Sequence, residues 1–184
     1  MTDAPTTRQR RRQPLLAVHT GDGKGKTTAA LGMALRAWAQ GWDVGVYQFV
    51  KSAKWRIGEE TAFDELGGVT WERMGEGWSW SRAHDEVTAA ELAREGWADV
   101  RAGLAAERHR FWVLDEFTYP LTWGWLDLDE VLAALRGRPG TQHVVVTGRD
   151  APQPLVDAAD LVTEMRKVKH PFDTGQRGQA GIEW

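Results

Sequence analysis

Residues 20–28 read TGDGKGKTT, and this stretch decides the fold. It follows a run of β-type residues at 15–20 and precedes an alanine-rich segment at 29–39. A strand, a glycine loop and a helix in this order form a phosphate-binding loop, in which backbone N–H groups and a helix N-terminus surround an oligophosphate. The alternative is a glycine-rich turn with solvated lysines, and the flanking strand and helix favour the phosphate loop.

The loop matches the end of the usual pattern, G-x-x-x-x-G-K-[ST], at residues 25–27, and it has Thr20 in the place of the first glycine. Its three glycines can adopt positive φ, which lets phosphate oxygens approach the backbone closely. We expect Lys26 to meet phosphate charge and the Thr27 hydroxyl to bind Mg²⁺. The residues predicted to bind a nucleotide here are Gly21, Asp22, Gly23, Lys24, Gly25, Lys26, Thr27 and Thr28.

The composition narrows the class of protein. A length of 184 residues is typical of a single domain. The 23 basic and 26 acidic residues give a net charge of -3, and a basic arm on an acidic body argues against nucleic acid as the main partner. The absence of cysteine excludes a disulfide framework, a thiolate metal site and a cysteine nucleophile. No window approaches the ~18 apolar residues of a membrane span, so we expect a soluble cytoplasmic protein with no membrane partner.

Strand and helix patterns alternate along the rest of the chain. Strands are predicted at residues 15–20, 44–50, 69–74, 111–114, 143–147 and 161–165. Helices are predicted at residues 25–40, 59–66, 85–107, 127–136 and 152–159. This alternation indicates an α/β fold with a mostly parallel sheet flanked by helices. Residues 1–13 are polar and basic, and we expect a disordered arm there, followed by one domain at 14–184.

Polar and aromatic segments follow the predicted strands. Asp115 and Glu116 close an apolar strand, which is the Walker B arrangement that places an acid near the magnesium on the phosphates. Arg149 follows the next strand, and tryptophan-rich loops are predicted at 75–81 and 117–126. Because ligands of parallel sheets bind outside the carboxyl ends of the strands, we expect these groups to converge on one edge.

Four segments together resemble one family, the P-loop-type ATP:corrinoid adenosyltransferases, also known as the CobA, CobO or BtuR family. They are GDGKGKTTAALG at 21–32, DEFTY at 115–119, VVVTGRDAP at 144–152 and VKHPFDTGQRGQAGIEW at 168–184. The resemblance covers residues 15–184, and the last segment is far more specific than the glycine loop. It implies a single-domain P-loop NTPase fold of the RecA-like kind.

The resemblance also implies a reaction. ATP would be attacked at its 5′ carbon by the Co(I) ion of a corrinoid, either cob(I)alamin or a cobyrinic acid derivative, with triphosphate leaving. The corrinoid is itself the nucleophile, so no protein base is required. Mg²⁺ would be a cofactor. An electron-donating flavoprotein would supply the electron that reduces the cobalt ion, and the protein would be a homodimer.

Roles for single residues follow from the same resemblance. Lys26 and Arg149 would stabilise the departing triphosphate, and Arg149 would add a phosphate contact. Thr27 and Glu116 would hold the metal, with Glu116 acting alone or together with Asp115.

Three more residues match positions of the family. Arg36 is a further nucleotide-binding candidate, and its alternative is a solvated helix residue. Trp78 and Trp80 match an aromatic pair that presses on the corrin from below and displaces its lower ligand, which makes Co(II) easier to reduce. Family members often carry phenylalanine at the first of these positions, and Trp78 keeps the required bulk and apolar character.

Two other functions are compatible with the residues. A P-loop small-molecule kinase or ATPase would use Lys26 and Glu116 for γ-phosphoryl transfer. A nucleotide-binding regulatory module would use its tryptophan loops to bind a protein. The phosphate product separates the three, because only adenosyl transfer yields triphosphate.

Overall fold

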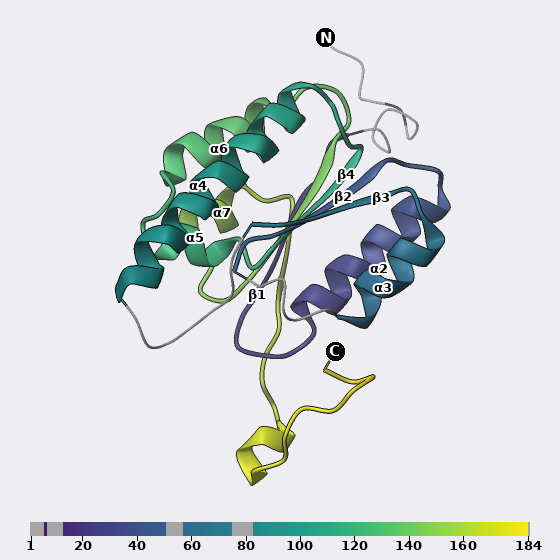
Figure 1. Cartoon of the computed structure of the whole chain (residues 1–184). Coiled ribbons are helices and arrows are strands. Elements are labelled where there is room, and N and C mark those ends of the chain that lie inside the picture. Colours follow the sequence, from purple (N-terminus) through teal and green to yellow (C-terminus); the bar gives the residue numbers. More distant parts are fainter. Residues whose placement is uncertain (1–5, 7–12, 51–56, 75–82, 184) are drawn as a thin grey trace.

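The computed structural model describes residue 6 and residues 13–50, 57–74 and 83–183, the side chains of 83–86 excepted. It has three layers, with one sheet between two layers of helices (Figure 1). The elements are β1 (Leu16–Thr20), α2 (Lys26–Ala39), β2 (Val44–Gln48), α3 (Gly58–Leu66), β3 (Val69–Arg73), α4 (Ala83–Ala105), β4 (Phe111–Asp115), α5 (Thr118–Thr122), α6 (Leu128–Gly137), β5 (His143–Thr147), α7 (Gln153–Ala158), β6 (Leu161–Glu164) and a 3-10 helix (Pro171–Thr174).

The sheet has six strands in the order β3-β2-β4-β5-β1-β6, and every paired strand is parallel to its neighbour. The central strands are almost continuous apolar runs that are buried along their length. Such strands suit a parallel sheet that is covered on both faces. Helices α2 and α3 cover one face, and α4 to α7 cover the other (Figure 1). The predicted α/β fold is thereby confirmed.

The two faces of the sheet carry separate apolar cores. Trp97, Trp112 and Phe117 belong to the core beneath α4 and α6, whereas Leu31 and Phe63 belong to the core beneath α2 and α3. Trp112 is fully buried, and its indole N–H donates to the His109 carbonyl oxygen at 2.8 Å. Of the eleven tryptophans in the chain, Trp97 and Trp112 therefore have a packing role.

Two segments differ from the sequence-based expectation. The predicted loop at 117–126 contains the short helix α5, and the C-terminal tail contains a 3-10 helix at Pro171–Thr174. Pro120 is compatible with α5 because it lies in the first turn, where backbone N–H groups have no intrahelical partner. The His170 ring accepts the Phe172 N–H at 3.1 Å and caps the 3-10 helix.

His109 makes the stability of the protein depend on pH. Its ring is buried beside Trp112, and its Nε2 lies 3.2 Å from the Tyr47 hydroxyl. Burial, assisted by the Arg108 charge, lowers the pKa of His109 from 6.5 to about 4. The unfolded chain then binds more protons than the folded one between these values, so the stabilising contribution is present above pH 6.5 and is lost as the pH falls towards 4.

We expect acidification from pH 7 to pH 5 to remove about 2 kcal/mol of unfolding free energy through His109. Urea unfolding of the wild type and of His109→Gln at both pH values measures this share. The variant should lose less stability than the wild type on acidification, and an equal loss in both proteins would contradict the assignment.

Candidate functional site

The glycine loop connects the end of β1 to the start of α2, at the carboxyl edge of the sheet. Gly21 has φ 91° and Gly25 has φ 109°, a left-handed conformation that favours glycine. Gly23 does not have positive φ. A Cβ at Gly23 would instead lie 2.6 Å from the Met165 carbonyl oxygen. Gly23 is therefore required by a close approach of two backbones.

Lys26 begins α2 and turns its side chain back over the loop. Its Nζ donates to the Gly21 carbonyl oxygen at 2.6 Å and to the Gly23 carbonyl oxygen at 2.7 Å. Burial is the main cause that lowers the pKa of Lys26, and the nearby Arg149 charge acts in the same direction. Both predicted cations thus lie close enough to interact electrostatically.

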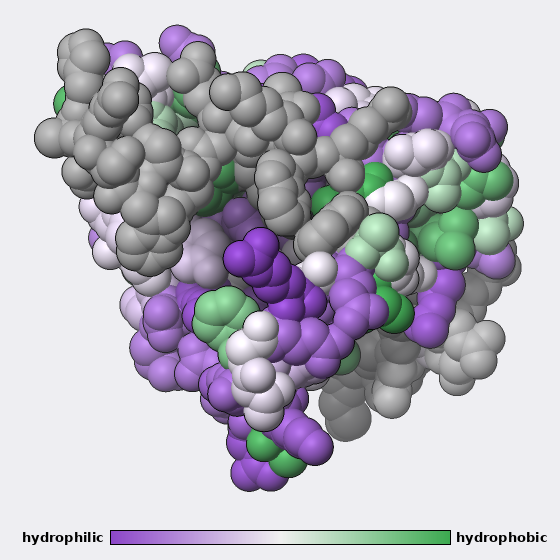
Figure 2. Space-filling model, turned by 60° about the horizontal axis from the view of Figure 1, so that its bottom comes forward, coloured by the Kyte–Doolittle hydropathy of each residue, from purple (hydrophilic) through white to green (hydrophobic). Residues whose placement is uncertain are grey.

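Carboxylates partly offset this positive charge. Asp22, Glu116 and Asp115 each raise the pKa of Lys26, in that order of effect, although burial outweighs them. The structure therefore brings the predicted loop residues and both carboxylates of the Walker B segment to one place at the carboxyl edge. Figure 2 turns the molecule so that this edge comes forward, and the surface that faces the viewer there is mainly hydrophilic.

Asp115 is the centre of a buried hydrogen-bond network at the end of β4. It is fully buried and accepts hydrogen bonds from Thr27 Oγ1 at 2.8 Å, Thr147 Oγ1 at 2.7 Å and Gln48 Nε2 at 3.0 Å. Because the Thr27 hydroxyl donates its proton to Asp115, its oxygen lone pairs face away from that bond and can meet a metal ion.

Glu116 follows directly and has a strained backbone. Its φ of 58° is left-handed, and its N–H donates to Thr147 Oγ1 at 3.0 Å. Such a conformation in a residue with a side chain costs on the order of 1 kcal/mol and is concentrated at functional sites. The turn separates the two adjacent carboxylates, so that Asp115 enters the interior while the Glu116 side chain stays half-exposed.

The donor set at this place is oxygen only, from the Thr27 hydroxyl and the carboxylates of Asp115 and Glu116. Across residues 13–50, 57–74 and 83–183, no three or more His, Cys, Asp or Glu side chains gather into a group that could hold a metal by themselves. Mg²⁺ prefers oxygen ligands and usually keeps several waters or substrate phosphates beside one or two carboxylates. The residues present therefore fit Mg²⁺ bound together with an oligophosphate.

The loop that carries Arg149 is held by two threonines that the sequence reasoning did not identify. Thr118 Oγ1 donates to the Arg149 carbonyl oxygen at 2.6 Å, and Thr20 Oγ1 accepts the Ala151 N–H at 3.2 Å. Gly148, with φ 144°, leaves room for Thr118, because a Cβ there would lie 1.9 Å from its hydroxyl oxygen. Thr20, the mismatch in the loop pattern, thus ties β1 to the Arg149 loop.

The C-terminal tail also contacts the glycine loop, a feature for which its sequence has no pattern. The Met165 N–H donates to the Thr20 carbonyl oxygen at 2.7 Å, and the Gly23 N–H donates to the Met165 carbonyl oxygen at 2.5 Å. Lys24 forms an ion pair with Glu183 at 2.5 Å. In Figure 1 the tail leaves the sheet at this edge and turns back towards it. Backbone and side chains of the tail therefore both touch the loop.

Of the described site residues that the sequence predicts, Arg36 is not brought to this cluster. Arg36 is exposed on α2, ten residues after Lys26 and thus about 15 Å farther along the helix axis. Thr28 is exposed in the first turn of α2. Trp78 and Trp80 lie outside the described residues. Their roles stay predictions.

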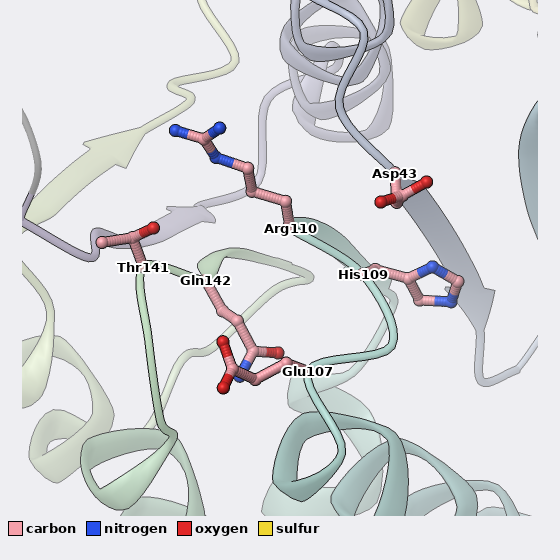
Figure 3. Close-up of a pocket in the computed structure, with 6 residues that line it drawn as sticks. All are labelled: Asp43, Glu107, His109, Arg110, Thr141 and Gln142. Atoms are coloured by element: carbon pink, nitrogen blue, oxygen red, sulfur yellow. The ribbon is translucent and has the colours of Figure 1, made fainter.

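A cavity of about 420 Å³ lies at the opposite edge of the sheet, where β2, β4 and β5 begin. Its lining residues are Asp43, Glu107, His109, Arg110, Thr141 and Gln142 (Figure 3). In Figure 3 the Arg110 guanidinium points away from Asp43 and His109, and it lies over the Trp42 ring at 4.1 Å. The Gln142 amide donates to the Leu104 and Pro139 carbonyl oxygens. The polar groups of Arg110 and Gln142 already have partners within the protein. We therefore do not assign the functional site to this cavity.

No helix among the described residues combines the length and the apolar character that a bilayer crossing requires. A likeness in fold comes from the flagellar accessory protein FlaH of Methanocaldococcus jannaschii, with a TM-score of 0.56 at 9% identity, covering 88% of this chain and 78% of that one. It supports the predicted P-loop fold and carries no statement about function.

Sequence comparisons are more specific. The chain is 42% identical over 183 residues to the corrinoid adenosyltransferase CobA of Salmonella typhimurium, covering 99% of this chain and 91% of that protein. It is 41% identical over 185 residues to the corrinoid adenosyltransferase of Pseudomonas aeruginosa, covering 100% of this chain and 90% of that protein. The family profile described as ATP:corrinoid adenosyltransferase BtuR/CobO/CobP matches residues 12–184. The chain therefore belongs to the ATP:corrinoid adenosyltransferase family.

Proposed function

We propose that this protein transfers the 5′-deoxyadenosyl group of ATP to the Co(I) ion of a corrinoid. The observation that carries the proposal is the convergence of the glycine loop, Glu116 and Arg149 at one sheet edge, in a chain of the adenosyltransferase family. In the reaction a Co–C bond forms with the electron pair of Co(I), the bond between C5′ and the phosphate oxygen breaks, and triphosphate leaves. No proton moves, which agrees with a site built from cations and hydrogen-bond donors.

The residues would act on the leaving group. Lys26 exchanges the two loop carbonyls that it now contacts for phosphate oxygens, and Arg149 adds a second cation beside it. Thr27 and Glu116 would hold Mg²⁺, with Asp115 fixing the Thr27 hydroxyl. When bound, the metal supplies positive charge to the triphosphate. The loop glycines, Asp22, Lys24, Thr28 and Arg36 remain nucleotide-binding proposals.

An ion pair between the C-terminal tail and the glycine loop is expected to weaken nucleotide binding. Lys24 is paired with Glu183, and both side chains are partly exposed, at 42% and 27%. A triphosphate has to take Lys24 away from this carboxylate, and exposed ion pairs are worth about 0.2–1 kcal/mol. We therefore expect Glu183→Gln to lower the dissociation constant of MgATP by about two- to fivefold.

Calorimetric titration with MgATP measures this change. Glu130→Gln is the matched control, because Glu130 forms an exposed ion pair with Arg101 and does not contact the loop. The gain should shrink as salt is added, since salt screens the exposed pair that the variant removes. Weaker ATP binding by Glu183→Gln would mean that Glu183 supports the nucleotide instead of competing with it.

For the corrinoid, the proposal relies on Trp78 and Trp80. They follow β3 along the chain and match the aromatic pair of the family. We expect Trp80→Ala to impair reduction of Co(II) on the enzyme more than adenosyl transfer from chemically reduced Co(I). Visible spectra recorded with and without a chemical reductant compare the two steps, and equal losses would remove the role in displacing the lower ligand.

The organisation of the protein completes the proposal. The catalytic domain would span residues 14–184, with residues 1–13 as a basic arm. The protein would be a cytoplasmic homodimer that receives its electrons from a flavoprotein. Light scattering of the purified chain measures the oligomeric state, and a monomeric mass would contradict the dimer.

The decisive experiment identifies the phosphate product. Incubation with MgATP and a chemically reduced corrinoid should yield triphosphate and a light-sensitive Co–C bond, seen by anion-exchange chromatography and visible absorption. Formation of ADP without a Co–C bond would instead indicate the kinase or ATPase. Tight ATP binding without turnover of any corrinoid would indicate the regulatory module.

A further inference from the structure

A cavity of about 320 Å³ lies between the glycine loop, the Arg149 loop and the start of the C-terminal tail. Its lining residues are Asp22, Arg149, Glu164, Met165, Arg166 and Lys167. The volume is in the range of small-molecule sites. Two of these residues, Asp22 and Arg149, already belong to the proposed nucleotide site, and four consecutive residues come from the end of β6 and the tail. The tail therefore forms one wall of a cavity that is continuous with the phosphate loop.

The start of the tail is held against the loop by its backbone. β1 and β6 are paired up to Thr20 and Glu164, and the two hydrogen bonds of Met165 extend this ladder into the loop as far as Gly23. A Cβ at Gly23 would lie 2.8 Å from the Arg166 carbonyl carbon. The backbone of Arg166 thus packs directly on the phosphate loop.

The charges of the lining favour an anion. The lining residues include three cationic and two acidic ones, and Lys26 interacts electrostatically with both Asp22 and Arg149. Lys167 is already paired with Asp173 at 3.0 Å. Within the part of the chain that the structure describes, no hydrogen bond or ion pair engages the Arg166 guanidinium. Arg166 is thus a cation of this wall that is available to a ligand.

We propose that Arg166 is a further phosphate-binding residue, which contacts the triphosphate of ATP from the tail side while Arg149 contacts it from the β5 side. The planar guanidinium can form two parallel hydrogen bonds to phosphate oxygens, which a lysine cannot reproduce. This inference rests on the proposed function. It adds a cation from a segment outside the glycine loop, the Walker B strand and the Arg149 loop.

Binding without a corrinoid tests the proposal. Isothermal titration with MgATP, and separately with inorganic tripolyphosphate, compares the wild type with Arg166→Ala, Arg166→Lys and the control Arg177→Ala. Arg177 is exposed in the same tail and does not line the cavity. We expect Arg166→Ala to raise both dissociation constants by about tenfold, Arg166→Lys to recover part of the affinity, and Arg177→Ala to bind as the wild type does.

Kinetics give a second readout. In the adenosyl transfer assay, Arg166→Ala should raise KM for ATP by about the same factor and leave KM for the corrinoid unchanged. Thermal unfolding of the variant should match the wild type, because the backbone contacts of residues 165 and 166 remain.

Three results would overturn the proposal. The first is unchanged binding of ATP and tripolyphosphate by Arg166→Ala, and the second is an equal loss of affinity in Arg177→Ala. The third is a loss of affinity that is the same in Arg166→Lys and Arg166→Ala and is accompanied by a lowered unfolding midpoint. The binding test does not depend on the proposed function. A wild-type protein that binds ATP without transferring its adenosyl group would still show whether Arg166 contributes to binding.

Discussion

Replacing Lys26 by alanine is expected to lower kcat/KM for ATP by about a thousandfold or more. The ammonium group is partly buried, contacts two loop carbonyls and lies near Arg149. In the reaction it would meet the negative charge that gathers on triphosphate as the bond to C5′ breaks. Losing an interaction that forms mainly in the transition state lowers kcat and kcat/KM together, with little change in KM.

The measurement is steady-state adenosyl transfer with chemically reduced corrinoid, so that cobalt reduction does not limit the rate. Lys24→Ala is the matched control, because Lys24 belongs to the same loop but is 42% exposed and paired with the tail. Its loss should be at least ten times smaller, in keeping with screening by solvent. A Lys26→Ala variant that keeps a tenth of wild-type activity would exclude the proposed role of the glycine loop.

Asp115→Asn is expected to affect stability and activity together. The carboxylate accepts hydrogen bonds from Thr27, Thr147 and Gln48 in a fully buried place. Both threonines donate to Oδ1 and Gln48 donates to Oδ2. An amide has one oxygen and one NH₂ group, so either Gln48 or the two threonines lose their acceptor, which costs about 1–3 kcal/mol. The network that fixes the direction of the Thr27 hydroxyl is weakened in either case, and we expect activity to fall by about a hundredfold with an increased requirement for Mg²⁺.

Urea unfolding and a magnesium titration of the transfer rate check the two effects. Asp129→Asn is the control, because Asp129 is an exposed carboxylate in the first turn of α6. The control should keep wild-type activity and lose little stability. An Asp115→Asn protein that is less stable but has an unchanged magnesium dependence would show that the network supports the fold without orienting a metal ligand.

The sequence predicted the parts of the site that depend on local pattern. The glycine loop is recognisable because glycines and Lys26 lie at fixed spacing between a strand and a helix. Asp115 and Glu116 are recognisable because they close a buried strand. The different roles of these two carboxylates cannot be predicted from the sequence. They arise from the left-handed backbone of Glu116 and the burial of Asp115, and neither property is visible in the residue types.

The missed features are contacts between distant segments. Gly23 and Met165 are joined through their backbones, which leave no mark on residue type, and Lys24 and Glu183 are separated by 159 positions. Thr20 looked like an imperfect match, yet its hydroxyl holds the Arg149 loop. Helix α5 was missed because its aromatic and proline residues resemble a loop, whereas burial of Pro120 and Leu121 stabilises it as a helix.

The place of β1 in the sheet has a consequence for protein synthesis. Its two neighbours are β5 and β6, which begin at His143 and Leu161, so the first strand of the chain pairs only with strands made last. At roughly 5–20 residues per second, β1 waits several seconds on the ribosome before either neighbour is available. Met165, which receives the Gly23 N–H, is made later still. A nascent chain that stops short of β5 therefore carries the whole TGDGKGKTT sequence but no finished site for a nucleotide.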